Sequence, residues 1–182
     1  YLRKKNKSIL NKYNFKDSYL NIIYFGSIGK ANGLLKVVDY FYKLEHKKIH
    51  LYIAGDGSEK DNIMYACNKR KQSNISFIGN HKMSDLSEII NCCDLSLISF
   101  LNLPILKTNS PNKLFDSLSA GKPLIVNSSG WTKDLVENNL CGFYYEYENF
   151  ESFSKMIDEI LIDPNRLLIM GKNSRSLAIN LF

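Results

Sequence analysis

Short apolar runs that alternate with amphipathic segments constrain the fold of this chain most strongly. The apolar runs, rich in Ile, Leu, Val, Tyr and Phe, lie at residues 21–25, 49–54, 74–78, 94–98, 123–126 and 142–145. The segments between them place apolar residues at helical spacing, as Leu34, Val38, Phe41 and Leu44 do. Strands that alternate with helices form a parallel sheet, because each connecting helix packs on a face of that sheet. The sequence therefore predicts an α/β, Rossmann-like, doubly wound parallel sheet of about six strands in the order 3-2-1-4-5-6, with helices on both faces.

A glycine-rich loop directly follows the first expected strand. It reads Gly26-Ser-Ile-Gly-Lys-Ala-Asn-Gly33, and a strand, a glycine loop and a helix in succession are typical of a turn that approaches phosphate. Its spacing differs from the dinucleotide fingerprint Gly-x-Gly-x-x-Gly, and it lacks the Gly-Lys-Ser/Thr ending of a P-loop. A nicotinamide-dependent dehydrogenase is therefore disfavoured. A tight turn with no ligand is the alternative interpretation of this loop.

Residues 108–123 predict a loop, a helix, a glycine stop and a buried strand. Ser110 suits the N-cap position, and Pro111 suits the first helical position, where no amide donor is needed. Gly121 and Pro123 end the helix. The helix start offers free N–H groups and a partial positive charge, which together hold a phosphate well.

Two charged residues give this helix its chemistry. Lys113 adds a full positive charge to the first turn, and Asp116 lies one turn beyond Asn112 on the same face. An acid in that place can accept hydrogen bonds from two ribose hydroxyls, as acids do in dinucleotide folds. The alternative is an ordinary capped helix whose Lys113 and Asp116 are merely solvated.

The stretch Ser110-Pro-Asn-Lys-Leu-Phe-Asp-Ser-Leu-Ser-Ala-Gly-Lys-Pro123 resembles the donor-site motif of the retaining GT-B glycosyltransferases often called group 1, or family 4. The resemblance is to the bacterial branch that builds capsule, O-antigen and exopolysaccharide with N-acetylated sugars. Three further stretches agree in order and spacing: the glycine loop, Leu51-Tyr-Ile-Ala-Gly-Asp-Gly57, and Ile75-Ser-Phe-Ile-Gly79 followed by Asp85-Leu86. The likeness runs from about Asn21 to the end, and it implies the C-terminal, donor-binding half of a GT-B fold.

The resemblance assigns roles to individual residues. It implies a catalytic set around the diphosphate and ribose, namely Lys30, Lys113 and Asp116. The substrate-binding residues that it implies are the loop glycines, two residues near the base and three near the sugar: Gly26, Gly29, Gly33, His81, Met83, Asn109, Ser110 and Asn112. Taken alone, His81 is an ordinary loop histidine. Members of the family commonly work without a metal, so no cofactor is expected.

The chain departs from the family pattern at three positions. Ser27 and Asn32 stand where many members carry Arg and Lys, so Lys30 is the only cation in the loop. Thr108 replaces the first of two acids that lie eight positions apart, and Asn109 and Ser110 then take over the sugar contacts. These departures motivate an alternative function, a non-catalytic nucleotide-binding or regulatory module.

The chain divides into a polar, basic segment over residues 1–20 and a nucleotide-sugar-binding domain over residues 21–182. We expect the first segment to be a solvated linker from a missing N-terminal acceptor domain, and its alternative role is contact with an anionic membrane or a lipid-linked acceptor. The resemblance therefore implies half of an enzyme, inactive in transfer on its own. A sugar-nucleotide 2-epimerase has a related architecture, but it would also need both halves.

Charge and cysteine content limit the remaining classes. The net charge of +6 favours anionic partners, yet no aromatic and basic residues interleave as in nucleic-acid binders. Four cysteines without a Cys-x-x-Cys pair, and three histidines without ligand spacing, indicate reduced thiols and no metal site. We expect a cytoplasmic protein that is peripheral, if anything, at the inner face of the cell membrane, since no apolar run approaches the roughly 20 residues of a membrane span.

Overall fold

A six-stranded parallel sheet forms the centre of the computed structural model, which describes residues 5–181. The strands are β1 (Leu20–Phe25), β2 (Ile49–Ala54), β3 (Ile75–Gly79), β4 (Leu95–Ile98), β5 (Leu124–Val126) and β6 (Gly142–Tyr144). Their order is β3-β2-β1-β4-β5-β6, and every pair of neighbours is parallel. The predicted fold class and strand order are confirmed.

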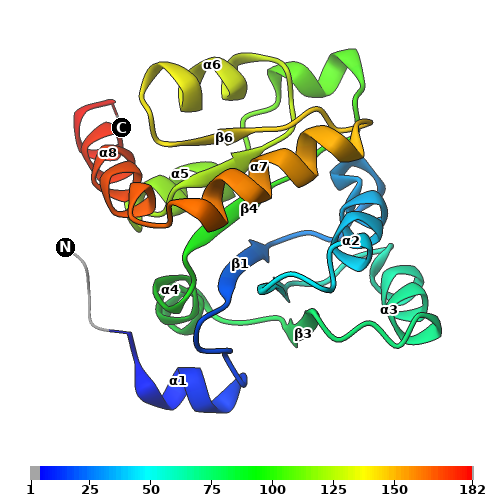
Figure 1. Cartoon of the computed structure of the whole chain (residues 1–182). Coiled ribbons are helices and arrows are strands. Elements are labelled where there is room, and N and C mark those ends of the chain that lie inside the picture. The colour runs from blue at the N-terminus through cyan, green and yellow to red at the C-terminus, as the bar shows by residue number, and fades with distance from the viewer. Residues whose placement is uncertain (1–4, 182) are drawn as a thin grey trace.

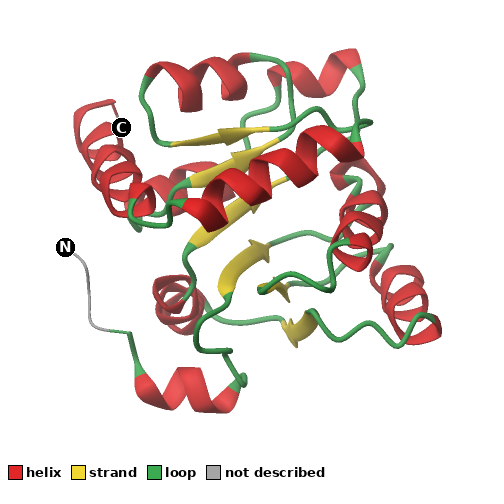
Figure 2. Ribbon diagram, in the orientation of Figure 1, coloured by secondary structure: helices red, strands yellow, loops and turns green. Residues whose placement is uncertain are grey.

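Helices connect the strands and cover both faces of the sheet (Figure 1, Figure 2). They are α1 (Lys7–Lys12), α2 (Leu34–Lys43), α3 (Lys60–Lys69), α4 (Met83–Cys92), α5 (Asn112–Ser119), α6 (Trp131–Asn138), α7 (Phe150–Ile162) and α8 (Arg166–Leu181), with short 3-10 turns η1 (Lys30–Asn32) and η2 (Pro104–Thr108). Between residues 5 and 181, no helix has the length and apolar character needed to span a bilayer.

The two faces of the sheet bury alternate residues of the same strands, as the two-residue period of a strand requires. Ile22 and Tyr24 of β1 point to one face, where they join the core that α2 and α7 cover. Ile23 and Phe25 point to the other face, under α4. Because both faces are covered, β1 is buried along its whole length.

The second face carries two separate cores. Over β1 and β2 the core includes Leu86 and Ile89 of α4. Over β4 and β5 it includes Leu114 of α5 and Leu177 of α8. The boundary between these cores runs between β1 and β4, where the strand order reverses direction. In open α/β sheets, this switch point is where ligands bind, outside the carboxyl ends of the strands.

The basic N-terminal segment packs against the body, although we expected a solvated linker. The Phe15 and Tyr52 rings stack with centroids 4.1 Å apart, and Ile9 and Tyr13 pack on the core under α4. β1 also begins at Leu20, one residue inside the expected linker. The apolar residues of this segment did not show a helical period, because α1 is only six residues long.

Candidate functional site

The glycine loop lies at the carboxyl end of β1 and is held by the turn that follows β2. The Gly26 amide donates to Ala54 O (2.9 Å), and the Ile28 amide donates to Asp56 O (2.8 Å). Gly55 makes this approach feasible, because a Cβ atom added there would lie 1.9 Å from Gly26 O. The backbone of Gly55 also has φ +154°, which favours glycine. The two turns therefore form one rigid unit at the edge of the switch point.

Lys113 joins this unit to the start of α5. Its Nζ donates to the Tyr24 hydroxyl (2.6 Å) and lies 3.9 Å from the centre of that ring. The Tyr24 hydroxyl in turn donates to Ser27 O in the glycine loop (2.5 Å). The lysine Cε also lies 3.5 Å from the Cβ position of Gly26, which places the lysine side chain against the glycine loop. One chain of hydrogen bonds thus runs from α5 through β1 to the loop.

The environment of Lys113 is poor in compensating charge. The side chain is half-buried, and burial lowers the pKa of Lys113 to about 7. Its nearest polar partner, the hydroxyl of the fully buried Tyr24, is neutral, since burial raises the pKa of that phenol well above its usual value. A lysine held in this way gains stabilisation from an anion that arrives beside it.

Helix α5 begins at Asn112, one residue later than the predicted first helical position, Pro111. Pro111 occupies the N-cap position in extended conformation, and no side chain caps the helix there. The Ser110 and Asn112 side chains are exposed, while the Asn109 carbonyl accepts a hydrogen bond from Trp131 Nε1 (3.1 Å). The amides of the first turn are thus not occupied by a side-chain cap. A helix start of this kind presents N–H donors to an anion.

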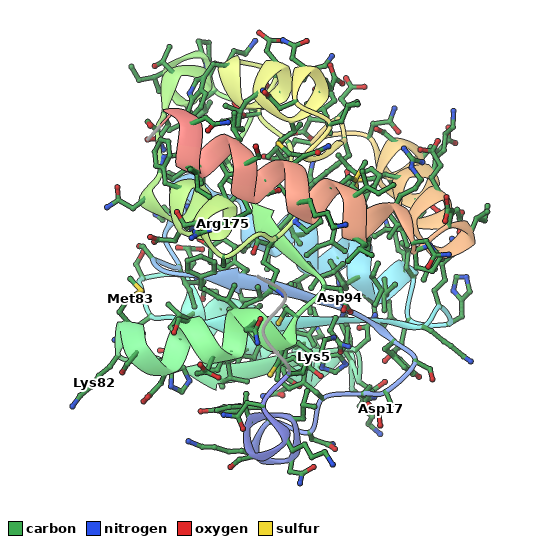
Figure 3. All side chains as sticks on the ribbon, turned by 90° about the vertical axis from the view of Figure 1, so that its left-hand side faces the viewer. Lys5, Asp17, Lys82, Met83, Asp94 and Arg175 are labelled. Carbon is green, nitrogen blue, oxygen red and sulfur yellow. The ribbon has the colours of Figure 1, made fainter. Side chains whose placement is uncertain are left out.

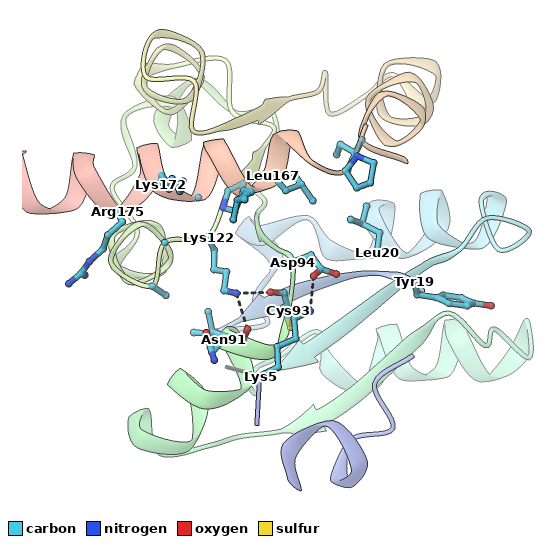
Figure 4. Close-up of a pocket in the computed structure, with 18 of the residues that line it drawn as sticks. Lys5, Tyr19, Leu20, Asn91, Cys93, Asp94, Lys122, Leu167, Lys172 and Arg175 are labelled. Carbon is cyan, nitrogen blue, oxygen red and sulfur yellow. Dashed lines mark hydrogen bonds and ion pairs between the residues drawn. The ribbon is translucent and has the colours of Figure 1, made fainter. Parts of the chain in front are cut away.

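Asp116 lies one turn further along α5, on the wall of a groove of about 1270 Å³. Met83 of α4 lines the same groove, which continues past Lys122 toward Arg175 of α8 (Figure 3, Figure 4). Burial raises the pKa of the Asp116 carboxyl. Lys113 lies one turn before Asp116 on α5, but neither Lys113 nor the glycine loop lines this groove, which also passes the amino ends of β1 and β5 at Leu20 and Pro123.

His81 is fixed at the carboxyl end of β3. Its Nε2 lies 2.6 Å from Ile78 O and 3.5 Å from the Tyr13 hydroxyl, and the Tyr13 and His81 rings meet edge to face. Met83 starts α4 and is 62% exposed. Met83 therefore lines the groove from the start of α4, and His81 lies two residues before it in the loop after β3.

The rest of the glycine loop is organised locally. The Gly29 amide donates to Asn32 Oδ1 (3.1 Å), and Tyr147 donates to Gly33 O (2.9 Å). Asn32, which stands where many relatives carry a lysine, is therefore buried as a structural residue of the loop. Lys30 is exposed at the first position of η1.

Sequence reasoning missed two residues, one beside the glycine loop and one in the groove. In the sequence, Tyr24 was counted only as part of the apolar run 21–25. A tyrosine in a buried strand just before a glycine loop could have been recognised as a candidate, because its hydroxyl needs a hydrogen-bond partner there. Lys122 is buried and donates to Asn91 O (2.9 Å) and Cys93 O (2.7 Å) at the end of α4. Among the residues from 5 to 181, no three His, Cys, Asp or Glu side chains gather closely enough to hold a metal ion.

Comparison with known families decides how this crevice is interpreted. Residues 5–177 match the family described as glycosyl transferases group 1. The chain belongs to the group 1 glycosyl transferases. A search of curated proteins finds no match at the significance required.

Solved structures of other glycosyltransferases share this fold. Sucrose-phosphate synthase from Thermosynechococcus elongatus superposes with a TM-score of 0.81 at 16% identity, over 100% of this chain and 46% of that one. HepE from Anabaena, solved with UDP and glucose, superposes with a TM-score of 0.77 at 17% identity, over 100% of this chain and 50% of HepE. The C-terminal domain of LpcC from Francisella tularensis superposes with a TM-score of 0.78 at 12% identity, over 98% of this chain and 93% of that domain. The chain thus spans about half of the longer relatives and nearly all of an isolated C-terminal domain.

Proposed function

We propose that this group 1 domain is the donor-binding half of a retaining glycosyltransferase that uses a nucleotide diphosphate sugar, of the UDP-N-acetylhexosamine type. The observation that carries the proposal is the position of Lys113. This lysine lies at the start of α5 and against the glycine loop at once. An anion at that point would meet an ammonium group, free helix amides and loop backbone together.

The remaining residues of the crevice suit the parts of a nucleotide. Asp116, one turn beyond Lys113, is placed to accept hydrogen bonds from the ribose hydroxyls. Met83 and His81 border the crevice on the β3 side, where a base fits. Lys30 adds charge to the diphosphate from the exposed side of the loop. HepE was solved with UDP, which supports a uridine nucleotide here.

The chemistry of the proposed reaction explains this set of groups. Transfer from a nucleotide diphosphate develops negative charge on the leaving phosphate and positive charge at the anomeric carbon. Donors fixed at the phosphate before reaction stabilise the transition state more than the ground state. Asn109, Ser110 and Asn112 at the start of α5 are then the nearest polar side chains for the sugar.

The described residues form a single sheet with its covering helices. We propose that an N-terminal acceptor domain of the same enzyme completes the site, and that residues 1–20 lie at the junction. On its own, the chain then binds the donor and transfers nothing. The proposed acceptor is a growing capsule, O-antigen or exopolysaccharide chain, and a cytoplasmic enzyme that acts on a lipid-linked acceptor would contact the inner face of the cell membrane.

A second function, nucleotide binding without transfer, is favoured by one specific observation. Asn32 is used inside the loop and offers no charge to a diphosphate, and Thr108 supplies no carboxylate. A transfer assay on a chain that includes the acceptor domain distinguishes the two functions. Sugar transfer to the acceptor supports the enzyme, and nucleotide binding without transfer supports the second function.

A titration followed by amide NMR tests the proposal on this chain. We expect UDP and UDP-N-acetylglucosamine to shift the amides of residues 26–33 and 110–116, and GDP-mannose to shift them less. Uridine, which lacks the diphosphate, serves as the control and should leave the glycine loop unchanged. If none of the diphosphates shifts these two segments, the proposed function is wrong.

A further inference from the structure

The hydroxyl of Tyr24 lies between Lys113 and the glycine loop. It is fully buried in β1, accepts a hydrogen bond from Lys113 Nζ (2.6 Å) and donates one to Ser27 O (2.5 Å). Both of its hydrogen-bonding functions are thus used on groups from two other segments. A phenylalanine in its place would fill the same volume and lose both contacts.

We propose that Tyr24 is a positioning residue, which holds Lys113 and the glycine loop in the arrangement that receives a nucleotide diphosphate and couples diphosphate binding to proton uptake by Lys113. This inference rests on the proposed function for the identity of the ligand. Tyr24 itself does not touch the ligand, because its side chain lies below the strand end and is covered by Lys113. Its effect is exerted through the position and protonation of that lysine.

The coupling to a proton follows from the groups around Lys113. The Tyr24 hydroxyl faces it from β1, the Ser27 carbonyl lies beyond that hydroxyl, and Asp116 is one turn away along α5. Lys30 is exposed on the loop. With the pKa of Lys113 lowered by burial to about 7, a large part of this lysine is neutral at pH 8. A diphosphate beside it favours the charged form, so binding takes up a proton.

The pH dependence of binding has a definite sign. Protonated Lys113 binds the diphosphate more tightly than neutral Lys113 does. We therefore expect UDP affinity to fall by up to tenfold per pH unit above pH 7, until the pKa of the bound state is reached. Below about pH 6 the terminal phosphate itself gains a proton, and that limits the comparison to higher pH.

Calorimetry of UDP binding at pH 8, in buffers of different ionisation enthalpy, tests the proposal. The wild type should take up a large fraction of a proton per UDP, because neutral Lys113 predominates at pH 8 before binding. In Tyr24→Phe, Lys113 loses its anchor and turns toward solvent at the open strand end. The uptake should then fall toward zero, and UDP should bind about tenfold more weakly. Wild-type affinity together with wild-type uptake in Tyr24→Phe would overturn the proposal.

Tyr52→Phe is the matched control. Tyr52 is also a fully buried strand tyrosine, but its hydroxyl lies 3.4 Å from Asn14 O, away from the glycine loop. This variant should keep wild-type affinity and proton uptake. An equal loss of affinity in both variants would show a general loosening of the sheet and contradict a specific role for Tyr24.

A measurement without nucleotide separates this proposal from the proposed function. We expect the side-chain carbon resonance of Lys113 to titrate near pH 7 in the wild type and near its ordinary value in Tyr24→Phe. If UDP does not bind at all, the proposed function fails, and this titration still tests the arrangement around Tyr24. An ordinary lysine titration in the wild type would overturn the inference, whether or not Tyr24→Phe folds.

Discussion

Lys113→Met weakens UDP binding by roughly 30-fold to 100-fold and raises or preserves the free energy of unfolding. Binding suffers because charge-assisted hydrogen bonds contribute about 1.5–3 kcal/mol each, and the diphosphate loses its buried ammonium partner. Stability does not suffer, because burial disfavours the charged form of Lys113, as its lowered pKa shows, and methionine removes that charge. Calorimetric titration and urea unfolding of the same preparation measure the two quantities together.

Lys133→Met is the control for this substitution. Lys133 is also a half-buried helical lysine, and it lies over an aromatic ring, 4.6 Å from the centre of Tyr144. It is on α6, away from the glycine loop, so we expect wild-type UDP affinity. If Lys133→Met and Lys113→Met weaken binding equally, the effect is one of net charge and the proposed diphosphate site is wrong.

Gly55→Ala should destabilise the chain by roughly 3 kcal/mol or more and abolish UDP binding at concentrations that saturate the wild type. The added Cβ would lie 1.9 Å from Gly26 O, and both sides of that contact are backbone. The glycine loop has to move, and its separation from Lys113 changes with it. Urea unfolding and calorimetry measure the two losses.

Gly79→Ala is the control that separates the cost of the backbone clash from the cost of the left-handed conformation. Gly79 also has positive φ (+81°), but no atom lies within 4 Å of its Cβ position. Alanine there should lower the free energy of unfolding by only about 1–2 kcal/mol, which is the cost of the left-handed conformation. A cost at Gly55 no larger than that at Gly79 would show that the two turns are not in rigid contact.

The sheet could be predicted from the sequence because the features that indicate its strands lie close together in the chain. Each apolar run is flanked by turn residues, and the crossover rule then leaves few strand orders to consider. The start of α5 was placed one residue early, because Ser110 and Pro111 fit the capping rules although Pro111 stays extended.

The site could be predicted only in part. The motif located Lys113 and Asp116 on one helix, but their relation to the glycine loop depends on residues about 90 positions apart. Nothing local to Tyr24 indicates that its hydroxyl bridges two segments, because this contact exists only once β1 and α5 are side by side. Likewise, the sequence showed only that Asn32 replaces the lysine of many family members. In the structure, its side chain accepts a hydrogen bond from the Gly29 amide, which explains why an asparagine is found there.

A crystal structure of this chain with UDP tests the central claim most directly. The claim is that the glycine loop, the start of α5 and Lys113 form one diphosphate site at the switch point between β1 and β4. The expected result is a diphosphate within about 3 Å of Lys113 Nζ and of the first amides of α5, with the ribose at Asp116. A diphosphate bound elsewhere, for example at Lys122 in the lower part of the groove, would contradict the account.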